Sequence, residues 1–339
     1  MSREAPVSVL HDTIADHAAA RAWRTLHPAH PEPEMLEVWR ENLKPAPASI
    51  YRLIFSTGTP RVVYAKRSPD LSVERTMYES VLPKLPIKSP IYYGFLEDPE
   101  GMCWIFLEDV GSERLSPRDP THRALAARWV AQLHLHGARI EAASCLPAAG
   151  AERYLGHLRA SRERIGRSLD HPAMSPEQRE ALAAVVALQD HLESRWDGIV
   201  RRCRQLPVTV VHGDLRPKNL RVRAEPPGVA LYGLDWETAG WGVAAPDLAP
   251  VGGRDLTMQI DTEVFRSAVC AAWPQLDAVS LRGLSLLGHI FRSLAGMDWE
   301  SLDLDSGVPE YFSRPVASLR VIADSVSRGL GSDAAEWLT

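Results

Sequence analysis

The chain has 339 residues and a formal net charge of -5 at pH 7, from 38 Lys and Arg against 43 Asp and Glu. Its hydrophobic fraction of 45% and charged fraction of 24% are ordinary for a globular protein and exclude a disordered, collagenous or coiled-coil chain. The length predicts two domains or one large two-lobed domain, and the scattered basic residues of this mildly acidic chain argue against a nucleic-acid partner.

The four cysteines predict a reducing compartment and no structural zinc, because neighbouring cysteines are more than thirty residues apart and no C-x-x-C pair occurs. The first residues lack the apolar run of a signal peptide. No stretch reaches the roughly 18 consecutive apolar residues that span a membrane. We therefore expect a cytoplasmic protein that has no membrane partner.

The first part of the chain predicts a helical extension at residues 1–44 and then a small β-rich lobe at residues 45–107. In the extension, apolar spacing and flanking prolines indicate helices at residues 8–26 and 35–43. In the lobe, runs of β-forming residues bounded by turn residues indicate four strands, with one amphipathic helix between the second and the third. These elements are expected at residues 50–55, 62–66, 71–85 (the helix), 91–96 and 102–107.

Long helices dominate the chain from residue 121 onward. They are expected at residues 121–138, 151–168, 175–204, 261–272, 279–296 and 311–328. Strand-like sequence interrupts them at residues 209–212, 220–223 and 230–234. A small mixed lobe would thus be joined, through a hinge at 108–111, to a large helical lobe at 112–339, with a cleft between the two.

Two motifs in the strand-rich island carry the strongest chemical signal. The sequence His-Gly-Asp-Leu-Arg-Pro-Lys-Asn occupies residues 212–219, and Leu-Asp-Trp-Glu occupies residues 234–237. For phosphoryl transfer, Asp214 would accept the proton of an acceptor hydroxyl, and Asn219 and Asp235 would hold a magnesium ion at the phosphates. The spacing D-x-x-x-x-N is that of kinase catalytic loops. A turn-rich hairpin could explain either motif alone, because these residues favour turns, but not both in this order behind a β-β-α-β-β lobe.

Together the motifs resemble the aminoglycoside phosphotransferase and choline kinase-like family, which has the protein-kinase-like fold. The resemblance covers about residues 45–325. It implies an α+β fold with a small β-rich N-terminal lobe and a large, mainly helical C-terminal lobe. It also implies a phosphotransferase that uses ATP or GTP with Mg²⁺. The acceptor would be a hydroxyl group of a small molecule such as an amino sugar, an antibiotic or a metabolite.

The resemblance implies that Lys66, at the end of a strand, holds the phosphates of the nucleotide. Its partner should be a glutamate on the following helix. At 100° per residue, Glu74 falls in the middle of the apolar face of that helix, whereas Glu79 falls among polar neighbours. Because a glutamate on an apolar face is costly unless it pairs with a buried cation, we expect Glu74 to be the partner of Lys66.

The remaining nucleotide contacts are expected in two places. Backbone groups near Glu108 and Val110 would meet the adenine edge. The loop that covers the phosphates would lie at residues 43–50, which contain prolines but no glycine, so fewer N–H groups are available. We expect the hydroxyl and the N–H of Ser49 to compensate.

The resemblance also suggests roles around the catalytic loop. Arg216 would stabilise charge on the transferred phosphoryl group or pair with a nearby acid. His212 and Gly213 would orient the loop, Asp247 would support the metal site from behind, and His134 would be a core residue.

Two further functions stay open at this stage. One is phosphorylation of Ser or Thr in a peptide, because Asp-Leu-Arg-Pro-Lys-Asn is similar to the catalytic loop of protein kinases. The other is a catalytically silent scaffold that keeps the fold to bind a partner, which the glycine-free loop suggests. Separately, the N-terminal extension could be a helical cap on the small lobe or an element that docks a protein partner. Finally, residues 297–305 contain several carboxylates and no Lys or Arg, which suggests either a solvated acidic loop or a binding site for a cationic acceptor.

Overall fold

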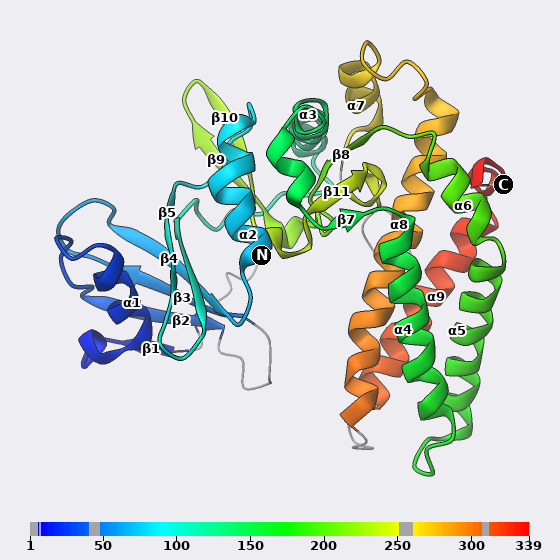
Figure 1. Ribbon diagram of the computed structural model, residues 1–339, viewed down its shortest axis with the longest axis horizontal. Helices are drawn as coiled ribbons and strands as arrows, with labels where there is room; N and C mark the ends of the chain where they lie inside the picture. The colour runs from blue at the N-terminus through cyan, green and yellow to red at the C-terminus, as the bar shows by residue number, and fades with distance from the viewer. Residues whose placement is uncertain (1–5, 7, 41–47, 251–259, 307–311, 339) are drawn as a thin grey trace. The chain divides into compact units, whose positions relative to one another are not determined.

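The computed structural model describes residues 6, 8–40, 48–250, 260–306 and 312–338 (Figure 1). They fall into two compact units. The first contains the described residues up to Arg114 together with Leu220–Glu237, and the second contains Leu115–Asn219 together with the described residues from Thr238 onward. The architecture is the expected α+β one, with a β-sheet unit and a mainly helical unit.

The first unit is built on a six-stranded antiparallel sheet with the order β1-β2-β3-β4-β6-β5. Its strands are β1 (Ser8–Leu10), β2 (Met35–Arg40), β3 (Ser49–Ile54), β4 (Val62–Ser68), β5 (Tyr92–Glu97) and β6 (Cys103–Glu108). Helix α1 (Ala18–Leu26) packs its Trp23 into the same core as Leu53 and Phe106. Burying this apolar surface against the sheet stabilises a helix that would be marginal alone.

The helix expected at residues 35–43 is wrong, since Met35–Arg40 form strand β2. Here Leu36 and Val38 are buried while Glu37 between them is half-buried, which is the two-residue period of a strand. The helix expected at residues 8–26 begins only at Ala18, because Ser8–Leu10 pair with β2. The described residues before β3 thus add two strands and a helix to the sheet unit, and their use as a docking element stays a prediction.

The helical stretch expected at residues 71–85 is present in three parts. It comprises α2 (Ser72–Thr76), a π-helical turn (Met77–Val81) and a 3₁₀ turn (Leu82–Lys84). The unit is completed by the hairpin of β9 (Leu220–Glu225) and β10 (Gly228–Gly233), whose Ala230 and Tyr232 pack against Val110.

The second unit consists of helices around a small sheet of β7 (Ala148–Ala149), β11 (Gly240–Val243) and β8 (Val208–Val211). Its α-helices are α3 (Pro120–Gly137), α4 (Ala151–Leu169), α5 (Pro176–Ser194), α6 (Trp196–Cys203), α7 (Thr262–Val269), α8 (Ala278–Ser301) and α9 (Ser313–Leu330). The single helix expected at residues 175–204 is divided at Arg195 into α5 and α6. Within the described ranges, no helix is both long and apolar enough to cross a membrane.

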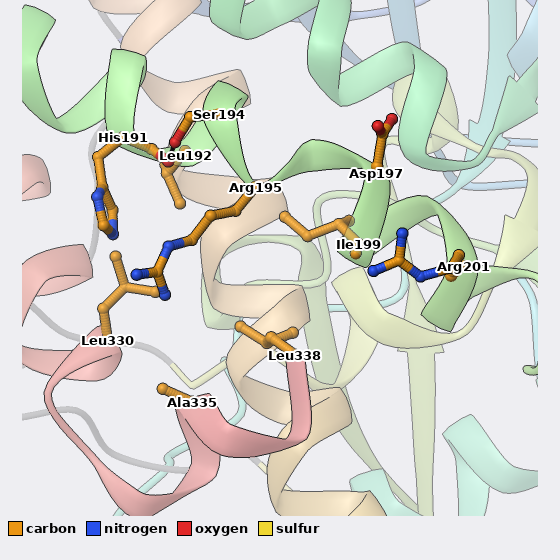
Figure 2. A pocket seen from close by; sticks show the side chains of 11 residues that line it. His191, Leu192, Ser194, Arg195, Asp197, Ile199, Arg201, Leu330, Ala335 and Leu338 are labelled. Carbon is orange, nitrogen blue, oxygen red and sulfur yellow. Dashed lines mark hydrogen bonds between the residues drawn. The ribbon is translucent and has the colours of Figure 1, made fainter.

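A pocket of about 290 Å³ lies in the helical unit, lined by residues of α5, α6, α9 and the C-terminal 3₁₀ turn Asp333–Leu338 (Figure 2). Arg195 and Arg201 line it beside apolar side chains such as Leu192 and Leu330. The residues expected to form the active site are not among those that line this pocket.

Candidate active site

Lys66 lies among three carboxylates in the sheet unit. Its Nζ is 2.8 Å from Oε2 of Glu74, 2.7 Å from Oδ1 of Asp235 and 3.3 Å from Oε2 of Glu237. Glu74 is only 2% exposed, whereas Glu79 binds Arg75 on the surface. The predicted pairing of Lys66 with Glu74 rather than Glu79 is therefore present, and the position of Glu74 on the buried face of its helix explains it.

Burial and charge act in opposite directions on this cluster. Burial lowers the pKa of Lys66, but the carboxylates of Glu74, Asp235 and Glu237 outweigh it and raise that pKa. Burial raises the pKa of Glu74 to about 7, against the opposing effect of Lys66. The raised pKa of Glu74 means that this buried carboxyl group titrates near neutral pH.

Oxygen atoms of Glu74, Asp235 and Glu237 lie within 4.8 Å of one another. Carboxylate oxygens suit a hard divalent cation such as Mg²⁺, so these residues fit a metal ion chemically. Asp235 has a backbone φ of 65°, in the left-handed region that Asp tolerates better than most residues. This conformation directly follows strand β10, where a turn to the 3₁₀ helix Trp236–Thr238 begins.

The loop expected to be catalytic, residues 212–219, directly follows strand β8, and the side chain of Asp247 holds its first residues. The carboxylate of Asp247 accepts hydrogen bonds from the backbone N–H groups of His212 (2.8 Å) and Gly213 (2.9 Å), and it lies 3.0 Å from Nε2 of His134. Asp247 and His134 are both fully buried. His134 therefore lies in the core as expected, and Asp247 holds the backbone of the loop. The expected support of the metal site by Asp247 stays a prediction.

Gly213 has a φ of 82°, which other residues rarely adopt. A Cβ atom there would lie 2.6 Å from the carbonyl oxygen of Thr238. The position therefore requires glycine twice over, for the turn and for the close approach.

Asp214 is surrounded by donors of the same unit. Nε of Arg216 lies 2.5 Å from Oδ1, Nζ of Lys218 lies 3.3 Å from Oδ2, and Nη2 of Arg292 lies 3.5 Å from Oδ1. The amide nitrogen of Asn219 donates to the backbone oxygen of Asp214 at 2.9 Å. Burial alone would raise the pKa of Asp214, but these cations outweigh it and lower that pKa, so the carboxylate is ionised at neutral pH.

Arg292 is a site residue that the sequence reasoning missed. It comes from α8 and also donates to the backbone oxygen of Leu215 at 3.1 Å. Its sequence signal is an arginine inside an otherwise apolar helical run, Leu-Gly-His-Ile-Phe-Arg-Ser-Leu. Burial lowers the pKa of Arg292 to about 10.

The residues expected to contact the nucleotide base, and the described residue of the loop expected to cover its phosphates, lie in the sheet unit. Ser49 is the first residue of β3, whereas residues 43–47 of the expected phosphate loop lie outside the described residues. Glu108 is the last residue of β6, and its N–H donates to the oxygen of Ile91 at 2.9 Å. Val110 is buried against the β9–β10 hairpin. Their contacts to a nucleotide stay predictions.

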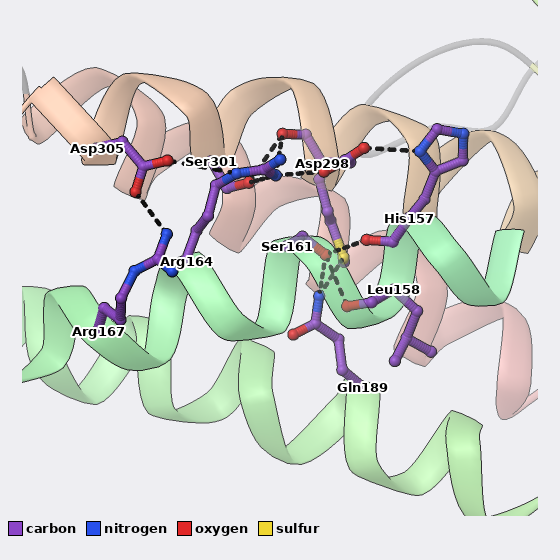
Figure 3. A network of polar contacts seen from close by, with 10 residues as sticks. His157, Leu158, Ser161, Arg164, Arg167, Gln189, Asp298, Ser301 and Asp305 are labelled. Carbon is purple, nitrogen blue, oxygen red and sulfur yellow. Dashed lines mark hydrogen bonds and ion pairs between the residues drawn. The ribbon is translucent and has the colours of Figure 1, made fainter.

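The acidic run at residues 297–305 is not an array of unneutralised carboxylates. It forms the end of α8 and a 3₁₀ turn (Leu302–Ser306), and arginines and a histidine from other helices reach it (Figure 3). Asp298 binds Arg164 and lies 2.7 Å from Nδ1 of His157, and Asp305 lies 3.1 Å from Arg167. Asp303 lies 2.8 Å from Arg314 of α9. The alternative of a cationic acceptor site assumed carboxylates without basic partners, and these contacts remove that assumption.

The catalytic and metal candidates thus divide between the two units. Lys66, Glu74 and Asp235 belong to the sheet unit, and Asp214 and Asn219 to the helical unit. Asn219 is directly followed by the β9–β10 hairpin, which leads to Asp235. A β-sheet unit with a buried Lys–Glu pair and a helical unit with an Asp–Asn loop together define a phosphotransferase with the protein-kinase-like fold.

Comparison with known proteins agrees with this class. Residues 73–282, more than half of the chain, match the sequence profile of the phosphotransferase enzyme family. The chain belongs to this family, and it is a phosphotransferase. No curated protein matches the sequence.

Several solved structures have a similar fold at low sequence identity. A GDP complex of an aminoglycoside 2'-phosphotransferase-IIIa mutant has a TM-score of 0.60 and 13% identity, covering 93% of this chain and 98% of that one. Spectinomycin phosphotransferase in complex with ADP and spectinomycin has a TM-score of 0.59 and 13% identity. This match covers 88% of this chain and 94% of that one. Choline kinase from Cryptosporidium parvum Iowa II has a TM-score of 0.56 and 12% identity. This match covers 87% of this chain and 90% of that one.

Proposed function

We propose that the enzyme transfers the γ-phosphoryl group of ATP, with Mg²⁺, to a hydroxyl group of a small molecule in the cytoplasm. The observation that carries this proposal is the Lys66 ammonium group held between Glu74 and Asp235. A buried cation with this pair of carboxylates suits nucleotide phosphates and their metal ion. The solved structures with bound ADP or GDP support a nucleotide as the donor.

The sheet unit would bind the nucleotide. Lys66 would contact its phosphates, and Glu74 would keep the ammonium group in place. Ser49 would supply a hydroxyl and an N–H to the phosphates, and the backbone at Glu108 and Val110 would contact the base. GTP stays an alternative donor, because the residues of the phosphate loop do not favour either base.

The helical unit would carry out the proton transfer. Asp214 is ionised at neutral pH and would accept the proton of the acceptor hydroxyl as it attacks phosphorus. Arg216 would neutralise charge that develops on the transferred group. Because the amide nitrogen of Asn219 donates to Asp214, its amide oxygen would bind the metal ion, as the carboxylate of Asp235 would. When bound, Mg²⁺ would neutralise phosphate charge.

The test is a transfer assay with ATP and Mg²⁺ on wild-type protein and two variants. Asp214→Asn should retain nucleotide binding and lose about 10²- to 10⁴-fold in turnover, because the amide cannot accept the proton. Asp235→Ala should lose Mg²⁺-dependent nucleotide binding, measured by calorimetry with and without the metal. Near-wild-type turnover in Asp214→Asn, or unchanged nucleotide binding in Asp235→Ala, would remove these residues from their roles.

A further inference from the structure

The surroundings of Asp214 are strongly basic. One carboxylate faces three cations, Arg216, Lys218 and Arg292, at 2.5, 3.3 and 3.5 Å. A hydroxyl group that gives its proton to Asp214 must therefore approach through a region of net positive charge. This charge acts on whatever else the acceptor molecule carries near that hydroxyl.

The three cations differ in how they are held. The side chain of Arg292 is 13% exposed and is also bound to the backbone of Leu215, so it is fixed. The side chains of Arg216 and Lys218 are 48% and 49% exposed. These two long side chains can turn from Asp214 towards a bound molecule, while Arg292 continues to neutralise the carboxylate.

A fourth cation lies beside the same loop. Arg153 of α4 donates to the backbone oxygen of Thr238 at 2.9 Å and to that of Pro147 at 3.2 Å. The oxygen of Thr238 is the atom that approaches Gly213 closely. Both of these contacts are to neutral carbonyl groups, so the charge of Arg153 adds to the positive potential at the loop.

Three described carboxylates of the helical unit have basic partners of their own. Asp247 is buried against His134. Asp298 and Asp305 in the acidic run are engaged by basic side chains of α4. These three acids are thus committed to the packing of helices.

We propose that the acceptor is an anion: a hydroxyl compound that carries a carboxylate or a phosphate a few bonds from the reacting hydroxyl. This inference rests on the proposed function and names its substrate class. Arg216 would turn from Asp214 and bind the anionic group, which matches the forked geometry of its guanidinium, and its remaining N–H groups would serve the transferred phosphoryl group. An amino sugar would instead bring positive charge to a site that already contains it.

The experiment compares acceptors that share a hydroxyl and a chain length but differ in charge. At saturating ATP and Mg²⁺, kcat/KM is measured for 3-hydroxypropanoate, propane-1,3-diol and 3-aminopropan-1-ol. Glycerol 3-phosphate separates phosphate from carboxylate. We expect the anionic compounds to exceed the diol, and the diol to exceed the amine, each by roughly tenfold or more.

Variants then connect the preference to Arg216. Arg216→Ala should raise the KM for the anionic acceptors by roughly tenfold to a hundredfold and leave the KM for ATP unchanged. Arg216→Glu should reverse the order of the anionic and cationic compounds. Arg266→Ala, which removes an exposed arginine paired with Glu263 on α7, is the matched control and should change neither KM.

Three results would overturn the inference. They are a wild-type preference for the amine, an Arg216→Ala effect on the KM for ATP alone, and failure of every anionic compound to be phosphorylated or to inhibit. In the last case, ATP hydrolysis without an acceptor separates the two proposals. If the wild type hydrolyses ATP and Asp235→Ala does not, only the anionic acceptor is excluded. If the wild type neither hydrolyses ATP nor binds it with Mg²⁺, the proposed function fails as well.

Discussion

The ammonium group of Lys66 is shared by more carboxylates than it can neutralise. Burial raises the pKa of Glu74 to about 7, so the folded protein binds this proton more tightly than the unfolded chain does. Stability from this group is therefore fully present below the ordinary carboxyl pKa and is lost as pH rises towards 7. The pKa of Glu74 is lower in the unfolded state than in the folded state, so its contribution to stability decreases as the pH rises.

Glu74→Gln should remove this dependence. The free energy of unfolding of the wild type, minus that of Glu74→Gln, should fall between pH 4.5 and pH 8 when measured by urea titration. Glu79→Gln, on the exposed side of the same helical stretch, is the control and should show no such trend. A difference that rises with pH would show that Lys66 dominates and that Glu74 is fully ionised.

The cysteines give a second prediction at this scale. Cys145 and Cys270 are exposed, whereas Cys203 is buried and its pKa is raised by burial to about 12. Because the thiolate is the reactive form, Cys145 and Cys270 should react rapidly with a disulfide reagent at pH 8. Cys203 should react only after denaturation. Cys145→Ser should lose one fast equivalent, and rapid labelling of Cys203 in the native protein would contradict the packing of α6.

Local pattern was enough to find Glu74 but not Arg292. Glu74 is eight residues from Lys66, and the helical period alone decides which face it occupies. Arg292 follows Asp214 by 78 residues, and no spacing rule connects a helix to a loop at that separation. The pairing depends on how α8 packs, which is a tertiary property. An arginine in an apolar helical run is a signal for a buried partner, but it does not identify that partner.

Among the elements, α8 approaches the 3₁₀ turn Ala245–Leu248 so closely that only glycine fits at Gly288. A Cβ atom there would lie 1.8 Å from the carbonyl oxygen of Ala245. Gly288→Ala should therefore destabilise the protein by about 1–3 kcal/mol or more, as overpacking does. Chemical denaturation measures the change.

The same helix provides the control. At Gly296 the nearest atom to an added Cβ would be 3.6 Å away, which is an ordinary contact. Gly296→Ala should stabilise the protein by about 0.5–1 kcal/mol, because alanine loses less backbone entropy in a helix. Equal effects of the two substitutions would mean that α8 does not contact the turn in this way.

Short elements were the least predictable. The backbone N–H and C=O groups of β2 (Met35–Arg40) are paired with those of β1 and β3. This pairing overrides the local preference for a helix. The first and fourth strands of the predicted lobe, bounded by clear turns, shift by only one residue in the structure. A pattern of β-forming residues only six residues long identifies a strand reliably when turn residues bound it at both ends.

At the scale of the whole molecule, the sheet unit is not a continuous segment of the chain. Residues up to Arg114 are completed by Leu220–Glu237, which supply the hairpin that packs on Val110 and the partner Asp235 of Lys66. The sequence indicated strands at this hairpin but not the unit that they join. Membership depends on contacts between residues more than a hundred positions apart, so no local pattern contains it.

This organisation predicts how fragments behave. A fragment of residues 1–114 should unfold at a lower urea concentration than the same fragment with residues 220–237 attached through a flexible Gly/Ser linker. The hairpin restores the 2.7 Å contact of Arg223 with Glu108 and the apolar contact of Tyr232 with Val110. Equal unfolding midpoints would show that the hairpin is not part of the unit's stability.

Helix α8 links the polar network of Figure 3 to the catalytic loop. Arg292 contacts the loop, and Asp298, six residues later, is bound to α4. At 1.5 Å per residue these positions are about 9 Å apart along the axis. A helix is stiff over that length, so sliding of α8 against α4 would displace the Arg292 guanidinium by a similar amount. The contacts of the acidic run with α4 would thereby fix the position of Arg292 at the loop, although none of these acids touches that loop.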